Sequence, residues 1–327
     1  MPGGLSSEII RRHICVLTIN LTWRCGTRCS YCYRAATVDQ DAGTILDKRA
    51  LIRELRAARK CGVREYRFSG GDPLVVGDRL FEYADIVSAV TGEKPALLSS
   101  GAGITPGWLK KARGKFSEIA VSVENPLAPL QTKLDVENLL EIIRQYTCDE
   151  TPLTYGLTLV SADRFRDVVD IFTMLYDNVG RKFMPQLDYP CLRTYEPPSP
   201  PQLADLRRET ASLFERFGLI PCYFAYFVGS LNWAANRQLR INVNLDPDGS
   251  YQIYDSFLER LQIEYRWQKY IRAQQQSSSR CGKCEWVDCC THHPRWELRY
   301  DWCELRRAVF EGMYDGLWGR KGQLKAP

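Results

Sequence analysis

The stretch Ile14–Cys32, which reads ICVLTINLTWRCGTRCSYC, decides the fold. Its first part is a largely apolar run, which predicts a buried strand. The loop after it carries three thiols, Cys25, Cys29 and Cys32, separated by three and two residues. Thiolate is the ligand that iron–sulfur clusters use, and three thiols can hold three irons of a four-iron cluster. The fourth iron then has no local cysteine, and an open iron is a place for chemistry.

Zinc is the alternative for this loop, because thiolate suits zinc as well as iron–sulfur clusters. A structural zinc site needs a fourth ligand, which the loop does not supply. On the triplet alone, a zinc site completed from elsewhere and a chance cluster in a cysteine-rich chain both stay open.

Length and composition describe an ordinary globular protein. The chain has 327 residues, 45% hydrophobic and 25% charged, enough for one α/β barrel plus an appendage. The net charge of +5 comes from Lys and Arg spread along the chain, which argues against nucleic-acid binding and allows docking of an acidic electron carrier.

The 13 cysteines bear on the compartment and on metal binding. Met1–Leu5 does not resemble a secretory leader, and no apolar run reaches the roughly 18 residues of a membrane span. We therefore expect a cytoplasmic protein without membrane contact, whose clustered cysteines bind metal rather than form disulfides. The isolated thiols are expected to be ordinary buried groups: Cys15, Cys61, Cys148, Cys191 and Cys222.

Strand-like and helix-like segments alternate six times. The expected strands are 14–21, 66–69, 96–100, 119–124, 155–160 and 182–187, and the expected helices are 48–60, 80–90, 108–113, 134–146, 165–176 and 204–217. Such alternation predicts a parallel sheet with helices outside, here a partial (β/α)6 barrel of TIM type. Functional residues of such sheets lie at the carboxyl ends of the strands.

The character of the chain changes near Leu219, so we expect a barrel over 1–218 and a cysteine-rich α+β domain over 219–327. Within the second part, 239–245 alternates like a half-buried strand, and Asp246–Gly249 is a turn signal. Together with 250–254 these predict a hairpin. The segments 195–201 and 274–279 are expected to be a stiff connector and a flexible linker.

The cysteine spacing resembles that of the radical S-adenosylmethionine (SAM) superfamily. The segment Gly70-Gly71-Asp72-Pro73 is similar to that family's Gly-Gly-Glu-Pro, with Asp in place of Glu. The resemblance implies a [4Fe-4S] cluster on Cys25, Cys29 and Cys32, with SAM on the open iron. Glycines let a ligand approach the backbone, and carbonyls with a carboxylate suit the ammonium group of SAM. The resemblance implies further SAM contacts at Tyr31, Ser100, Ser122 and Glu124.

A second cysteine group resembles the distal half of a SPASM or Twitch auxiliary-cluster domain. By that resemblance, one auxiliary [4Fe-4S] cluster would be held by Cys281, Cys284, Cys290 and Cys303, with Cys289 as a rival to Cys290. Tyr254 and Pro294 stand where a full SPASM domain has cysteines, so a second auxiliary cluster is not expected. Zinc is the alternative here too, because CxxC followed by further cysteines and His292-His293 also describes a zinc knuckle.

The resemblance implies an enzyme that cleaves SAM to a 5′-deoxyadenosyl radical and abstracts hydrogen from a substrate. We expect a ribosomally made peptide, with flavodoxin or ferredoxin as electron donor. Only about 14 residues precede the first strand, so a leader-binding domain is expected to be a separate protein. The alternatives are a small-molecule enzyme acting on a sugar or cyclitol and a zinc-stabilised binding protein. By position alone, Tyr226, Asp188 and Glu196 are candidates for an acid or base.

Overall fold

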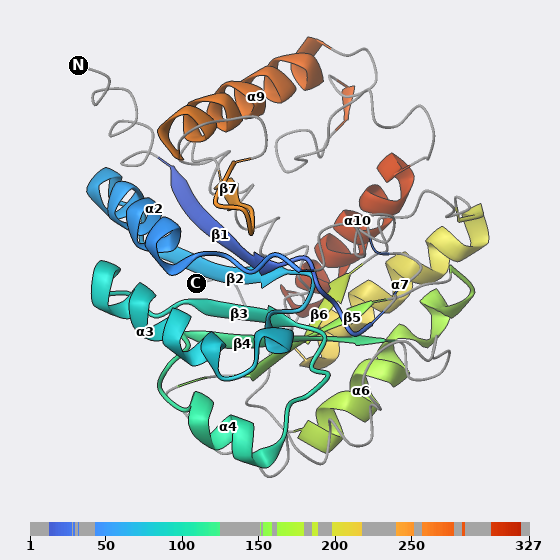
Figure 1. Cartoon of the computed structure of the whole chain (residues 1–327). Helices are drawn as coiled ribbons and strands as arrows, with labels where there is room; N and C mark the ends of the chain where they lie inside the picture. Colours follow the sequence, from blue (N-terminus) through green and yellow to red (C-terminus); the bar gives the residue numbers. More distant parts are fainter. Residues whose placement is uncertain are drawn as a thin grey trace.

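The computed structural model describes residues 13–27, 29, 32, 43–124, 151, 153–158, 162–179, 185–188, 198–217, 240–251, 257–277, 283–284 and 302–321. Strands and helices alternate through most of these residues (Figure 1). The strands are β1 Ile14–Thr22, β2 Glu65–Gly70, β3 Ala96–Ser99, β4 Glu118–Glu124, β5 Leu153–Thr158, β6 Pro185–Asp188 and β7 Arg240–Leu245. The α-helices are α2 Lys48–Cys61, α3 Arg79–Thr91, α4 Pro106–Ala112, α6 Val168–Val179, α7 Pro200–Phe217, α9 Phe257–Ser277 and α10 Trp302–Lys321, with 3-10 turns η1 Pro73–Val76 and η2 Ala162–Asp167.

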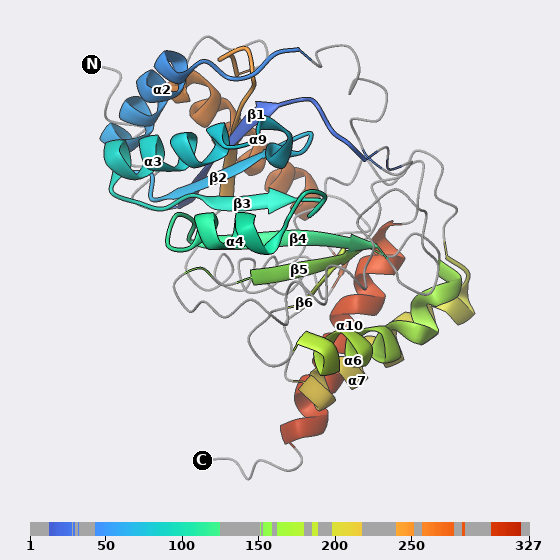
Figure 2. The ribbon, with the colours of Figure 1, turned by 60° about the horizontal axis from the view of Figure 1, so that its bottom comes forward.

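The strands form one parallel sheet in the order β6-β5-β4-β3-β2-β1-β7. Helices α2, α3 and α4 cover one face of strands β1 to β4 (Figures 1 and 2). This is the α/β architecture of a partial barrel that the alternation predicts. Because all strands run the same way, their carboxyl ends meet along one side of the sheet.

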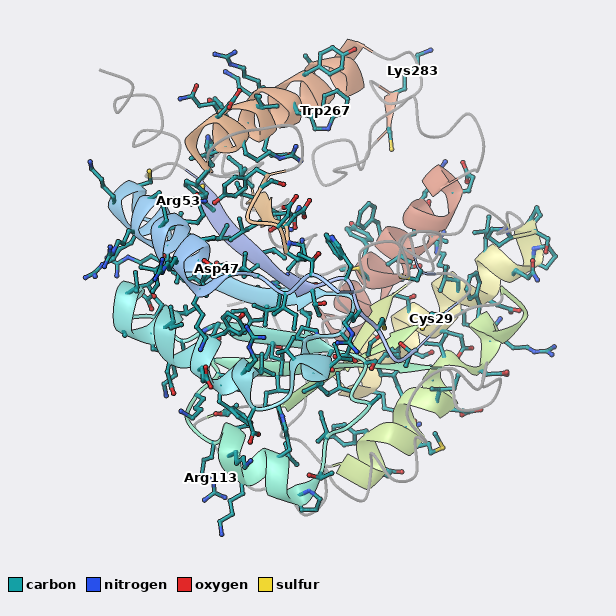
Figure 3. All side chains as sticks on the ribbon, viewed as in Figure 1. Cys29, Asp47, Arg53, Arg113, Trp267 and Lys283 are labelled. Atoms are coloured by element: carbon teal, nitrogen blue, oxygen red, sulfur yellow. The ribbon has the colours of Figure 1, made fainter. Side chains whose placement is uncertain are left out.

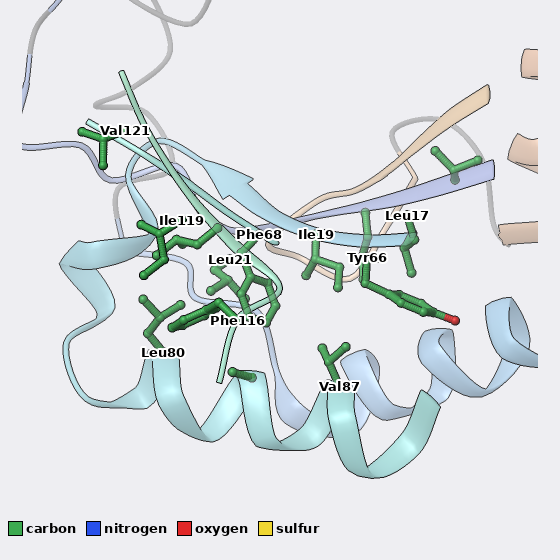
Figure 4. Close-up of a cluster of buried hydrophobic side chains, with 14 of the residues drawn as sticks. Leu17, Ile19, Leu21, Tyr66, Phe68, Leu80, Val87, Phe116, Ile119 and Val121 are labelled. Carbon is green, nitrogen blue, oxygen red and sulfur yellow. The ribbon is translucent and has the colours of Figure 1, made fainter. Parts of the chain in front are cut away.

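Strand β1 is buried along its whole described length. Leu17, Ile19 and Leu21 have no exposed surface and belong to the core under the helices, together with Phe68. Figure 4 shows this cluster between the sheet and α3, where Leu80 packs against it. Side chains alternate across a strand, so the polar positions of β1 lie on the opposite face of the sheet. There, Thr18 Oγ1 donates to Asn242 Oδ1 over 2.7 Å.

Helix α2 begins and ends where its sequence predicts. Asp47 is its N-cap, and the carboxylate accepts from the backbone N–H groups of Arg49 and Ala50 at 2.9 and 3.0 Å. Gly62 ends the helix with φ of 97°, a left-handed conformation that glycine adopts without steric cost. The cap fixes where α2 starts after the cysteine loop.

Strand β7 differs from the expectation. Its residues were expected in an antiparallel hairpin of a second domain, but Arg240–Leu245 pairs in parallel with β1 as the seventh strand of the main sheet. Ile241, Val243 and Leu245 are buried while Asn242 is exposed, so the alternation is that of an edge strand. The expected turn at Asp246–Gly249 is present, with Gly249 N–H donating to the Asp246 carbonyl over 2.9 Å. Residues 252–254 of the predicted return strand lie outside the described residues.

Two more expectations change in the carboxyl-terminal third. The linker expected at 274–279 is wrong over its first four residues, because α9 continues to Ser277. Glutamine is a good helix former and continues the helix. The proline-rich connector ends at Pro200, where α7 begins; the fixed φ of proline suits the first helical turn. The expected helix at 134–146 lies outside the described residues.

Helices α7 and α10 pack against each other beside β5 and β6 (Figures 1 and 2). Helix α9 lies at the opposite edge of the sheet, against β7 and α2. In the described part of the chain, no helix combines the length and hydropathy that crossing a bilayer requires.

Candidate functional site

The candidate site lies at the carboxyl ends of β1, β2 and β3. A register shift between Asn20 and Thr22 interrupts the pairing of β1 with β2 just before the cysteine loop. Beyond it, the N–H of Gly71 donates to the Thr22 carbonyl and the N–H of Asp72 donates to the Arg24 carbonyl, both over 2.8 Å. The Gly70–Asp72 segment is therefore bonded directly to the residues that lead into Cys25.

Both glycines are required by close backbone packing. A Cβ atom at Gly70 would lie 2.3 Å from the Thr22 carbonyl oxygen, and the φ of Gly70 is 127°. A Cβ atom at Gly71 would lie 2.2 Å from the Arg24 carbonyl oxygen and 2.5 Å from that of Trp23. The atoms that a Cβ would contact belong to the backbone, so they cannot shift without distorting the chain there. The Gly-Gly pair lets two strand ends approach without side chains between them.

Asp72 is buried, with 2% of its surface exposed. Its carboxylate caps η1 and bonds to the end of β3, at Ser99 and Ser100. Pro73, the first residue of η1, is also buried. Of the residues predicted to contact SAM, Gly70, Gly71, Asp72, Pro73 and Ser100 thus lie together at adjoining strand ends.

The cysteine loop follows β1 on the same side of the sheet. Figure 3 shows Cys29 on the side toward which the strand arrows of Figure 1 point. Cys29 is buried, whereas Cys25 and Cys32 are half-buried, and all three are free thiols. The N–H of Cys32 donates to the Cys29 carbonyl over 3.0 Å, and Cys25 Sγ lies 3.1 Å from Thr27 Oγ1.

Among the described residues, these three thiols included, no three His, Cys, Asp or Glu side chains converge closely enough to hold one metal ion. The donor set nevertheless fits a four-iron cluster. The three sulfurs are uncommitted to disulfides, lie within eight residues and leave one iron for another ligand. The close-packed glycine backbone beside the loop fits a ligand that approaches main-chain atoms. Cys25, Cys29 and Cys32 would hold the cluster, and Gly70-Gly71 would face its SAM ligand.

The other predicted SAM contacts are less completely described. Ser122 is half-buried on β4, two strands from β2, and Glu124 is the last residue of that strand. Tyr31 lies outside the described residues. Of the acid and base candidates, Asp188 ends β6, whereas Glu196 and Tyr226 lie outside the described residues.

The carboxyl-terminal cysteines are described only in part. Cys284 is a half-buried free thiol, and Cys303 is the second residue of α10. Cys281, Cys289, Cys290 and the two histidines lie outside the described residues. The auxiliary-cluster prediction therefore stays a prediction.

Sequence reasoning missed two parts of the site. Ser99 shares the Asp72 carboxylate with Ser100, and adjacent serines at a strand end were the only signal. The carbonyl groups of Thr22 and Arg24, which accept from Gly71 and Asp72, carry no sequence signal, because every residue has a backbone carbonyl.

Comparison with known proteins gives a family for the part of the chain that contains this site. Residues 19–172 match the family model described as "Radical SAM superfamily". GTP 3′,8-cyclase of Geobacter sulfurreducens is 34% identical over 96 residues, 29% of this chain and 29% of that protein. GTP 3′,8-cyclase of Mycobacterium sp. strain KMS is 39% identical over 103 residues, 30% of this chain and 27% of that protein. The match thus spans less than a third of the length of these relatives.

Solved structures are similar over much more of the chain. Native anSMEcpe with bound AdoMet and Cp18Cys peptide has a TM-score of 0.67 at 15% identity, covering 95% of this chain and 99% of that chain. Streptococcus suis SuiB bound to S-adenosylmethionine has a TM-score of 0.57 at 14% identity, covering 87% of this chain and 75% of that chain. At such identities the likeness establishes a shared fold. The cysteine loop lies within the matched residues, so residues 19–172 are a domain of the radical SAM superfamily of enzymes, on a fold that the solved structures share.

Proposed function

We propose that this protein binds a [4Fe-4S] cluster through Cys25, Cys29 and Cys32 and uses it to cleave SAM reductively. The observation that carries the proposal is the bonding of Gly70–Asp72 to Thr22 and Arg24, which joins the glycine backbone to the root of the cysteine loop. When bound, the cluster and SAM would supply a 5′-deoxyadenosyl radical that abstracts hydrogen from a substrate. The residues of the chain hold, orient and enclose these groups, while an external protein such as flavodoxin or ferredoxin supplies the electron.

The test compares two thiols of the same segment. Cys29→Ala removes a proposed ligand, whereas Cys15→Ala removes a thiol that is buried in β1 under the helices. After anaerobic reconstitution, Cys29→Ala is expected to lose about four irons per chain and to release no 5′-deoxyadenosine above background with SAM and dithionite. Cys15→Ala should keep both. Wild-type protein that contains zinc and no iron, or that releases no 5′-deoxyadenosine, contradicts the proposal and favours the zinc-stabilised binding protein.

For the substrate we propose a ribosomally synthesised peptide that this enzyme modifies in the cytoplasm. Support comes from the similarity over 95% of the chain to anSMEcpe, whose structure includes a peptide, and from the similarity to SuiB. The second candidate is a small molecule, favoured by the local sequence identity to GTP 3′,8-cyclases. Incubation with SAM, reductant and either candidate peptides or GTP separates the two by mass spectrometry. Conversion of GTP while all candidate peptides stay unchanged would contradict the proposed peptide substrate.

We also propose one auxiliary [4Fe-4S] cluster on Cys281, Cys284, Cys290 and Cys303, within residues 219–327. The described support is that Cys284 is a free thiol and that Cys303 lies in the first turn of α10. Cys284→Ala is expected to reduce iron from about eight to about four per chain while leaving the cluster of Cys25, Cys29 and Cys32 able to cleave SAM. Loss of one zinc per chain instead would identify the site as a zinc site.

A further inference from the structure

Both oxygens of the Asp72 carboxylate accept hydrogen bonds from donors of the protein. Its Oδ1 accepts from the N–H of Leu74 at 3.0 Å and from the hydroxyl of Ser99 at 2.8 Å. Its Oδ2 accepts from the N–H of Ser100 at 3.3 Å and from the Ser100 hydroxyl. An ionised carboxylate offers about four lone-pair positions, so each oxygen already has its two donors.

Both serine hydroxyls are committed on their accepting side as well. Ser99 Oγ accepts from the N–H of Gly101 at 2.9 Å, and Ser100 Oγ accepts from the N–H of Ala102 at 3.3 Å. Gly101 has φ of 82°, and its carbonyl accepts from the N–H of Ile104 at 3.0 Å. The carboxylate, through these two hydroxyls, therefore shapes the turn that follows β3.

The main chain of the same residue is bonded to a different strand. The N–H of Asp72 donates to the carbonyl of Arg24, which directly precedes the proposed cluster ligand Cys25. Asp72 itself follows β2 after one glycine. One residue thus links the ends of β1 and β2 through its backbone to the end of β3 through its side chain.

We propose that Asp72 is a positioning residue and not the group that binds the ammonium of SAM. It holds the cysteine-loop root, the Gly70-Gly71 backbone and the Ser99–Ala102 turn in one arrangement, with Ser99 and Ser100 as its partners in that turn. An ammonium group could reach the carboxylate only by displacing one of four donors at a position that is 2% exposed. Leaving a buried donor without its acceptor costs free energy, so the exchange is disfavoured. The role in SAM binding rests on the function proposed above.

A thermodynamic cycle that combines one substitution at Asp72 with one change in the ligand separates positioning from direct contact. Asp72→Asn keeps the size of the side chain but turns a donor toward the Ser100 N–H. The binding of SAM and of its analogue with hydrogen in place of the amino group is measured by calorimetry on reconstituted protein. If Asp72 positions the site, the substitution weakens both ligands, and the loss for SAM exceeds the loss for the analogue by less than tenfold. If Asp72 binds the ammonium, SAM loses at least tenfold more affinity than the analogue, and the proposal is overturned.

Asp72→Glu provides a second discriminating variant. The longer side chain carries the carboxylate one methylene beyond its four donors, so we expect weaker SAM binding than in the wild type. Direct contact predicts equal or tighter binding, because a longer carboxylate reaches a ligand more easily. Equal or tighter binding therefore contradicts the proposal.

The final measurement uses protein without cluster or SAM. In Asp72→Asn we expect the amides of Gly101 and Ala102 to exchange hydrogen at least tenfold faster than in wild type, since their hydroxyl acceptors are released. In Ser99→Ala we expect the same change for the amide of Gly101, whose acceptor is the Ser99 hydroxyl. Ser88→Ala on α3 is the matched control and should leave this exchange unchanged. Unchanged exchange in Asp72→Asn would refute the network. Wild-type protein that binds no SAM would refute the proposed function, while the exchange result still decides whether Asp72 holds the turn.

Discussion

The chemistry of each cysteine in this segment depends on whether it lies in β1 or in the loop that follows. Cys15 and Cys29 are both buried, but only Cys15 lies within a strand, in the core under the helices. Burial raises the pKa of the Cys15 thiol to about 12, because a thiolate there would lose its hydration; the nearby Cys61 and Glu65 add to this. The isolated thiol is thus chemically inert, as its sequence context predicts.

The raised pKa of Cys15 makes stability depend on alkaline pH. The unfolded chain loses this proton near pH 8.5–9, whereas the folded chain keeps it until about pH 12. Above pH 9 the unfolded state therefore binds fewer protons, and the free energy of unfolding falls by up to about 1.4 kcal/mol per pH unit from this group. Urea unfolding at pH 8, 9 and 10 measures the slope. Cys15→Ala should show a shallower slope, and an identical one would contradict the assignment.

At the scale of elements, α10 depends on a close approach to α7. A Cβ atom at Gly312 would lie 2.4 Å from the Arg207 carbonyl oxygen and 2.8 Å from the Cβ of Thr210. At the same crossing, Arg207 donates to Glu311 over 2.5 Å and to Asp315 over 2.6 Å. These ion pairs are partly exposed and contribute little by themselves. The absence of a side chain at Gly312 is what lets the helices pack.

Substitution of Gly312 tests this packing. Gly312→Ala is expected to destabilise the protein by about 2 kcal/mol, because the new methyl group overpacks against backbone that cannot yield. Gly107→Ala is the matched control: it lies in α4, and its nearest atom would be Thr105 Oγ1 at 3.9 Å. That change should be neutral or stabilise by up to about 1 kcal/mol, since alanine favours helix. Equal effects of the two substitutions in thermal unfolding would contradict the packing argument.

At the scale of the whole molecule, β7 joins the carboxyl-terminal part of the chain to the sheet. Ile241, Val243 and Leu245 are buried beside β1, and Asn20 Nδ2 donates to Asp246 Oδ1 over 3.2 Å. After β7, Tyr251 donates its hydroxyl to the buried carboxylate of Glu54 on α2 over 2.8 Å. The residues on either side of the expected boundary at 218 are therefore packed against each other in the described structure.

A fragment that ends at the expected boundary should consequently fold poorly. Residues 1–218 lack β7, so the edge of β1 and its buried side chains would be exposed to solvent and to other chains. We expect this fragment to be aggregated on size-exclusion chromatography, with broad thermal unfolding, whereas the full chain unfolds cooperatively. A monomeric fragment with the full chain's melting temperature would show that residues 1–218 are an independent domain.

The sequence by itself was sufficient for several local structures and for the family. Hydrophobic runs, caps and turns depend on neighbouring residues, so β1, α2 and the turn at Asp246–Gly249 are found within one or two residues of their predicted bounds. The cysteine spacing indicated the radical SAM family for the same reason, because its ligands lie on one short loop. The matched family agrees with that indication.

Only the tertiary structure decided which strand pairs with β1 and which groups meet at the strand ends. Parallel pairing joins residues more than 220 positions apart, as between Thr18 and Asn242, and alternation alone cannot distinguish an edge strand from a hairpin. The commitment of Asp72 to Ser99 and Ser100 depends equally on how two strands end side by side. Partners of this kind are chosen by long-range packing, and packing in three dimensions leaves no local pattern in the chain.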